Sequence, residues 1–128
     1  YPKFVYIPNS INDETLRKCA MFRTKNRFPA LSYFHAKTGA SIWRSSQCMT
    51  GITSQRSDED EKMLLEICVT CPKQKKVYVV DARSKFAAYG NRAKGGGSEH
   101  EQYYTSCEVD YGNIDNIHAV RDSYKKLC

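Results

Sequence analysis

The sequence has 128 residues, of which 41% are apolar and 27% charged, as expected for one globular domain with a hydrophobic core. Lys and Arg outnumber Asp and Glu by 20 to 14, and the positive charges are spread along the whole chain. This composition excludes a dense disulfide scaffold and a membrane-spanning helix, because the six cysteines are too few and no apolar run is long enough. Since the chain starts at Tyr1 without a signal peptide, we expect a processed or excised N-terminus and an intracellular protein with reduced thiols.

The first half of the chain predicts a helix, a hairpin and a second helix. Asn12 precedes two acids and a stripe of apolar residues at helical spacing, which predicts a helix with Asn12 as its cap. Residues 28–34 and 40–44 favour strands, and the loop between them contains Gly39 at a position that requires positive φ. Ser57 with Asp60 three positions later resembles a capping box, and the helix behind it is expected to turn Leu64, Leu65 and Cys68 inward.

The second half predicts alternating strands and helices. After a break at Pro72, Val77–Val80 has the continuous apolar character of a buried strand, and Phe86–Tyr89 suggests one helical turn ended by Gly90. Residues 108–111 favour another strand, and a C-terminal helix follows, capped by Asp115. This alternation predicts an α/β fold.

The cysteines do not provide the catalytic centre of a thiolate phosphatase, which requires an Arg six positions after the nucleophilic Cys. The residues at that spacing are Lys25, Ser54, Gln74, Val77 and Asn113, and Cys128 ends the sequence. The Cys68-x-x-Cys71 pair has the spacing of half a zinc site, but no second pair completes it, so we expect no metal. Gly95-Gly96-Gly97 either turns backbone amides toward an anion or lets the loop pass close beneath its neighbours, and spacing favours the second interpretation.

The positive charge is compatible with phosphates of lipids or of nucleic acid, but no groove-reading motif or aromatic stacking pattern supports nucleic acid. Several segments, in this order, resemble the myotubularins, a family of phosphoinositide 3-phosphatases. The matching segments are 27–33, 44–47, 58–61, 80–83, 91–97, 113–118, 121–123 and 126–127.

The resemblance implies that residues 1–128 form the N-terminal part of a myotubularin-like phosphatase domain. Its fold would be partial and similar to that of protein-tyrosine and dual-specificity phosphatases, with a central sheet flanked by helices. In this family the Cys-x5-Arg loop lies C-terminal to the matched region, so this chain would supply scaffold and substrate contacts without the nucleophile. The matched substrate contacts are Asn91, Asn116 and Ile117, with helix capping as the structural alternative for Asn116.

The implied substrates are phosphatidylinositol 3-phosphate and the 3,5-bisphosphate, cleaved without a cofactor at their 3-phosphate. The implied partners are the lipid headgroup at a membrane surface and further copies of the chain or other myotubularins. The implied location is cytoplasmic and peripheral on endosomal membranes. An inactive or truncated family member that acts as a regulatory or binding protein remains the alternative, since the sequence does not decide whether the protein is an enzyme.

Overall fold

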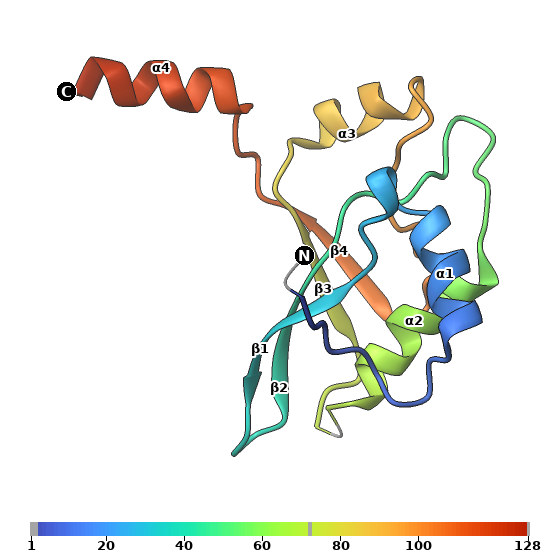
Figure 1. Cartoon of the computed structure of the whole chain (residues 1–128). Helices are drawn as coiled ribbons and strands as arrows, with labels where there is room; N and C mark the ends of the chain where they lie inside the picture. Colours follow the sequence, from blue (N-terminus) through green and yellow to red (C-terminus); the bar gives the residue numbers. More distant parts are fainter. Residues whose placement is uncertain (1–2, 72, 128) are drawn as a thin grey trace.

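The computed structural model describes residues 3–71 and 73–127, so expectations placed on Tyr1, Pro72 and Cys128 lie outside the described residues. Helices and strands alternate along most of the chain, which confirms the α/β class (Figure 1). In chain order the elements are α1 (Asp13–Met21), the 3-10 helix η1 (Thr24–Asn26), β1 (Ala30–His35), β2 (Ala40–Arg44), α2 (Asp58–Val69), β3 (Val77–Asp81), α3 (Lys85–Arg92), β4 (Cys107–Tyr111) and α4 (Ile117–Leu127).

Helices α1 and α2 pack together and supply most of the core (Figure 1). Both predicted caps are present: Asn12 Oδ1 accepts from the Thr15 amide at 2.8 Å, and Ser57 Oγ accepts from the Asp60 amide at 3.3 Å. The prediction for Leu65 is wrong, because its side chain is 49% exposed and lies about 100° around α2 from the inward-facing Leu64. The buried cluster contains Ile11, Cys19, Met63, Leu64, Ile67, Tyr104 and Cys107.

Strands β1 and β2 form the predicted antiparallel hairpin, in which Leu31 lies opposite Trp43 and His35 lies opposite Ala40. Gly39 has a φ of +75°, and its amide donates to the His35 carbonyl at 2.9 Å. The hairpin turn therefore uses glycine for the positive φ that the sequence predicted.

Strands β3 and β4 pair in parallel, from Val77 opposite Cys107 to Asp81 opposite Tyr111. The connection between them contains α3, which Ser84 caps by accepting from the Ala87 amide at 3.1 Å. The expectation of a single turn ended by Gly90 is wrong, because α3 continues through Gly90 to Arg92. A glycine inside a helix costs only about 1 kcal/mol, so Gly90 does not by itself end α3.

The expected central sheet is divided in the described part of the chain into two pairs of strands, β1–β2 and β3–β4. The expectation that β3 is buried on both faces is also wrong, since Tyr78 and Val80 are 66% and 72% exposed. Val77 and Val79, on the other face, pack against the core cluster. Only one face of this strand pair is therefore covered within residues 3–71 and 73–127.

Helix α4 projects away from the remainder of the structure, as Figure 1 shows, and none of its described residues is buried. Its apolar residues lie at helical spacing, from Ile117 through Val120 and Tyr124 to Leu127. No helix among the described residues has the length and apolar character needed to cross a membrane.

Candidate functional site at the carboxyl ends of the parallel strands

The chain segments that leave β3 and β4 stay side by side beyond the sheet. The Gly112 amide donates to the Asp81 carbonyl at 2.7 Å, and the Ile114 amide donates to the Ala82 carbonyl at 2.8 Å. As a result, α3 and α4 both begin at the carboxyl edge of this strand pair (Figure 1). In open α/β sheets this edge is the usual location of ligand sites.

Arg83 connects three segments at this edge. Its guanidinium binds Asp81 through two bonds, Nε to Oδ1 at 3.0 Å and Nη2 to Oδ2 at 2.6 Å. The remaining donors reach the Gly97 carbonyl, at 3.0 Å from Nη2, and the Gln47 side-chain oxygen. Burial would raise the pKa of Asp81, but the hydrogen bonds and charge of Arg83 outweigh it, and the pKa is lowered. Asp81 thus offsets the positive charge of Arg83. The Arg83 side chain holds the segments that contain Asp81, Gln47 and Gly97 together at this edge.

The glycine segment passes closely beneath the chain that follows β2. A Cβ on Gly97 would lie 1.8 Å from Thr50 Oγ1, and a Cβ on Gly96 would lie 2.6 Å from Gln47 Oε1. The Gly96 amide donates to the Asn91 carbonyl at 3.0 Å, and the Gly96 carbonyl accepts from the Gly51 amide at 3.1 Å. The structure therefore confirms the close-packing interpretation for Gly96 and Gly97, whereas a Cβ on Gly95 would meet no atom within 4 Å and Gly95 instead has a positive φ of +85°.

Asn91 lies in the last turn of α3 and is half-buried. Its carbonyl accepts from the amides of Lys94 and Gly96, both at 3.0 Å, so its backbone is held by the glycine segment. Within the described residues, its side-chain carboxamide has no hydrogen-bond partner. The carboxamide is therefore available to donate to a ligand.

Asn116 caps α4: its Oδ1 accepts from the His118 amide at 2.9 Å and from the Ala119 amide at 3.2 Å. The prediction of Asp115 as the cap is wrong by one residue, and the helix begins at Ile117. The amides of Asn116 and Ile117 have no partner in the described part of the chain. They are directed out of a helix N-terminus, where backbone amides favour anions.

The structure places Asn91, Asn116 and Ile117 at the same end of the strand pair but in different segments. No hydrogen bond joins Asn91 to either of the other two among the described residues. Their role as substrate contacts remains a prediction.

The described cysteines are unsuited to nucleophilic attack, because all of them are buried. Burial raises the pKa of Cys48 to about 12 and that of Cys107 to about 11. Burial and the carboxylate of Asp60 also raise the pKa of the Cys19 thiol. Such thiols stay protonated and unreactive at neutral pH. Within residues 3–71 and 73–127, no three His, Cys, Asp or Glu side chains are grouped as metal ligands would be.

Sequence patterns alone do not identify the residues that support this edge, namely Gln47, Thr50 and the Arg83–Asp81 pair. Consecutive glycines do indicate that another segment approaches closely. The sequence does not show which segment approaches, because Arg83 contacts Gln47, 36 positions away, and Gly97, 14 positions away. Local patterns do not reveal contacts over such separations.

A parallel strand pair with a glycine-rich connection and a helix N-terminus at its carboxyl edge has the form of an anion-binding α/β unit. The sequence matches the myotubularin-like phosphatase domain over residues 1–128. The chain therefore belongs to the myotubularin-like phosphatase family.

Named relatives cover the chain almost completely. Phosphatidylinositol-3,5-bisphosphate 3-phosphatase MTMR2 of Bos taurus is 42% identical over 127 residues, which are 99% of this chain and 20% of the relative. Myotubularin-related protein 9 of Homo sapiens is 44% identical over 99% of this chain and 23% of the relative. Phosphatidylinositol-3-phosphatase myotubularin-2 of Arabidopsis thaliana is 42% identical over 99% of this chain and 16% of the relative. The chain thus spans about a fifth of the length of these relatives.

Proposed function

We propose that the chain forms one wall of the substrate pocket of a phosphatase that removes the 3-phosphate of phosphatidylinositol 3-phosphate or the 3,5-bisphosphate. The observation that carries this proposal is the position of α4, whose free N-terminal amides lie at the carboxyl edge of β3 and β4. The names of the bovine and Arabidopsis relatives support a phosphoinositide as the substrate class.

In this role the amides of Asn116 and Ile117 bind phosphate oxygens, and the Asn91 carboxamide donates from the end of α3. These groups bind and orient the headgroup, while a Cys-x5-Arg loop outside this chain supplies the nucleophile. Because the substrate is a membrane lipid, the protein would work at a membrane surface, and we place it on the cytoplasmic face of endosomes. Association with other myotubularins is a further part of the proposal.

A regulatory protein without catalysis is the second candidate. The human relative, at 44% identity, carries a name that states no activity, although it resembles this chain as closely as the named phosphatases do. In that case the same edge would bind a headgroup or a partner without turnover.

The test is a chimera in which this chain replaces the matching 127 residues of bovine MTMR2. The variant Asn116→Asp keeps an oxygen acceptor for the helix cap but adds a negative charge beside the expected phosphate. We expect kcat/KM for phosphatidylinositol 3,5-bisphosphate in vesicles to fall by about tenfold or more, with unchanged circular dichroism. Asn116→Ala should also weaken catalysis without unfolding the domain.

Asn12→Asp is the matched control, since it makes the same change at the cap of α1, whose N-terminus lies at the opposite end of the structure (Figure 1). Its kcat/KM should equal that of the unchanged chimera. Equal values for Asn116→Asp and Asn12→Asp would remove Asn116 from the substrate pocket. A chimera that binds the vesicles without releasing phosphate would support the regulatory candidate.

A further inference from the structure

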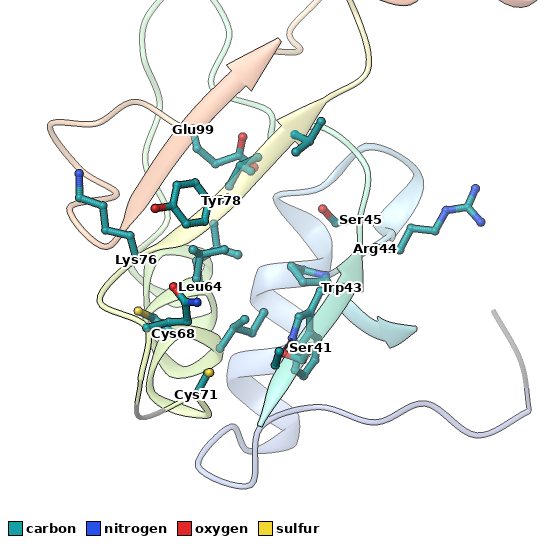
Figure 2. Close-up of a pocket in the computed structure, with 17 residues that line it drawn as sticks. Ser41, Trp43, Arg44, Ser45, Leu64, Cys68, Cys71, Lys76, Tyr78 and Glu99 are labelled. Carbon is teal, nitrogen blue, oxygen red and sulfur yellow. Dashed lines mark hydrogen bonds between the residues drawn. The ribbon is translucent and has the colours of Figure 1, made fainter. Parts of the chain in front are cut away.

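A hollow lined by two arginines lies beside the β1–β2 hairpin. Its walls are the N-terminal segment at Val5, the start of β1 with the residues before it, and the residues at the end of β2. Figure 2 shows the Arg44 side chain, which lines this hollow, directed away from Tyr78 of β3. The hollow has a volume of about 650 Å³, which is the size of a small-molecule site. It contains none of the three candidate substrate contacts on α3 and α4.

The backbone holds Arg27 and Arg44 on neighbouring segments. Arg44 lies opposite Ala30 in the hairpin. Two residues further along, the Ser46 amide donates to the Arg27 carbonyl at 3.0 Å, and the Ser46 hydroxyl donates to the same carbonyl at 3.2 Å. The two arginines therefore enter the hollow from fixed positions rather than from free loops.

An irregularity in β1 adds a serine to the same hollow. The strand register passes from Leu31 opposite Trp43 to Tyr33 opposite Ile42, so Ser32 is the extra residue of a bulge. A bulge redirects a side chain out of the regular alternation of a strand. Ser32 and Ser45 both line the hollow, and their hydroxyls have no hydrogen-bond partner within residues 3–71 and 73–127.

The positive charge in this hollow is not neutralised by the part of the chain that the structure describes. Neither the Arg27 nor the Arg44 guanidinium forms an ion pair or a hydrogen bond there, whereas Arg83 binds Asp81 at 2.6 Å. The described residues that line the hollow include no Asp or Glu. Two unpaired guanidinium groups in one concave site create a positive potential that favours an anion.

The groups in the hollow match the chemistry of a phosphate. A guanidinium binds phosphate oxygens through two parallel hydrogen bonds, and serine hydroxyls donate further bonds. A phosphate monoester offers three terminal oxygens, one more than a carboxylate, and carries more charge at neutral pH. We propose that this hollow is a second anion site, which binds a phosphate monoester group. The group belongs either to a phosphoinositide headgroup or to a soluble phosphate, and the site shares no residue with the proposed substrate pocket.

The first test titrates inorganic phosphate into the chain at constant ionic strength, with chloride as the balancing ion. Amide signals of Ser32 and Ser45 are followed by NMR. We expect both signals to shift and to saturate together. The absence of a saturable shift at these two amides would overturn the proposal. These signals report this hollow alone, so the result does not depend on whether the proposed phosphatase function is correct.

Substitutions of arginine separate a built site from general surface charge. We expect Arg44→Gln to weaken phosphate binding by at least about tenfold, because it removes a charged hydrogen-bond donor. Arg44→Lys keeps the charge but loses the paired hydrogen bonds, so its affinity should lie between those of Arg44→Gln and the unchanged chain. The matched control is Arg17→Gln, which removes an exposed arginine of α1 outside the hollow and should leave binding nearly unchanged. Equal weakening by Arg17→Gln and Arg44→Gln would contradict a specific site. Both changed arginines are exposed, and unchanged circular dichroism checks that the variants fold.

Vesicle binding identifies the source of the phosphate. The chain is sedimented with phosphatidylcholine vesicles that contain phosphatidylinositol 4-phosphate, or with vesicles that contain phosphatidylglycerol at equal total charge. Preferential binding to the first vesicles that Arg44→Gln abolishes would support a lipid headgroup as the ligand. Saturable binding of inorganic phosphate without preferential sedimentation would support a soluble phosphate. Equal sedimentation with both vesicles, together with no saturable phosphate binding, would leave only attraction to negative charge and overturn the proposal.

The chimera with bovine MTMR2 tests whether the hollow stays open when the remainder of a phosphatase domain is present. We expect the chimera to bind inorganic phosphate with an affinity similar to that of the chain, and Arg44→Gln to weaken it in the same way. If the chain binds phosphate and the chimera does not, another part of the domain fills the hollow. That result would overturn its assignment as a ligand site.

Discussion

Arg23 and Asp60 form a buried ion pair with two hydrogen bonds, from Nε to Oδ1 at 2.7 Å and from Nη2 to Oδ2 at 2.6 Å. The third guanidinium nitrogen binds Glu99 at 2.6 Å, and both Arg23 and Asp60 have fully buried side chains. Burial would lower the pKa of Arg23, but Glu99 and Asp60 outweigh it and keep the guanidinium charged. The Arg23 side chain thus joins Asp60 of α2 to Glu99, which lies two residues after the three glycines.

Replacing Arg23 should strongly destabilise the chain. Arg23→Met leaves the carboxylates of Asp60 and Glu99 buried without their partner, and we expect the free energy of unfolding to fall by about 3–5 kcal/mol. Urea denaturation followed by circular dichroism measures the loss. The control is Lys76→Met, which removes a half-exposed ion pair with Glu108 at 3.5 Å and should cost about 1 kcal/mol or less. Similar losses of unfolding free energy in the two variants would show that the buried Arg23 ion pairs stabilise the fold no more than the half-exposed Lys76–Glu108 pair.

Two glycines within the same connection should respond in opposite directions to the same change. Gly97→Ala places a methyl group 1.8 Å from Thr50 Oγ1, so the buried Thr50 side chain must move, and we expect the free energy of unfolding to fall by about 1–3 kcal/mol. Gly90→Ala meets no atom within 4 Å inside α3 and should raise it by about 0.5–1 kcal/mol. Thermal unfolding of both variants tests this contrast. Adding Thr50→Ala should partly restore Gly97→Ala, and a lack of rescue would mean that Thr50 is not the obstacle.

The elements that the sequence predicted correctly have local signals. The caps Asn12 and Ser57 begin α1 and α2, and Gly39 lies where the hairpin needs positive φ. The errors at the start of α4 and at the end of α3 arise where local chemistry allows two answers. Asp and Asn are both good caps, so Asp115 and Asn116 cannot be told apart, and glycine often ends a helix, although Gly90 does not. The tertiary pairings were not predictable, since Arg23 meets Asp60 and Glu99 across 37 and 76 residues.

Asp60 illustrates how a correct local interpretation can miss the role of a side chain. Acids in the first turn of a helix are stabilised by the helix dipole, and the Asp60 amide does bond to the Ser57 cap. Its carboxylate, however, binds Arg23 and Tyr104 in the core rather than closing the capping box.

The candidate site was predictable only through family resemblance, because its edge is assembled from segments on either side of α3.

Stability should depend on pH through the Asp81–Arg83 pair. Because Arg83 lowers the pKa of Asp81 in the folded state, this contribution is fully present above the unfolded pKa of about 4. It is lost as the pH falls from that value through the lower folded pKa. Asp81→Asn should therefore lose less free energy of unfolding between pH 6 and pH 3 than the unchanged chain does. Urea titrations at several pH values measure the difference, and parallel curves for the two proteins would contradict the assignment.

The isolated chain should not hydrolyse phosphatidylinositol 3-phosphate. No Arg stands six positions after any of the five cysteines that the structure describes, and all five are buried. Burial raises the pKa of Cys48 to about 12 and that of Cys107 to about 11, so we expect none of the described thiols to act as a thiolate nucleophile. Phosphate release from vesicles that contain the lipid should equal that of buffer, while the chimera with bovine MTMR2 serves as the positive control. Turnover by a clean preparation that persists when all six cysteines are changed to serine would require a different mechanism located within this chain. Turnover that disappears in one of the serine variants would instead identify a nucleophile that acts without the Cys-x5-Arg loop.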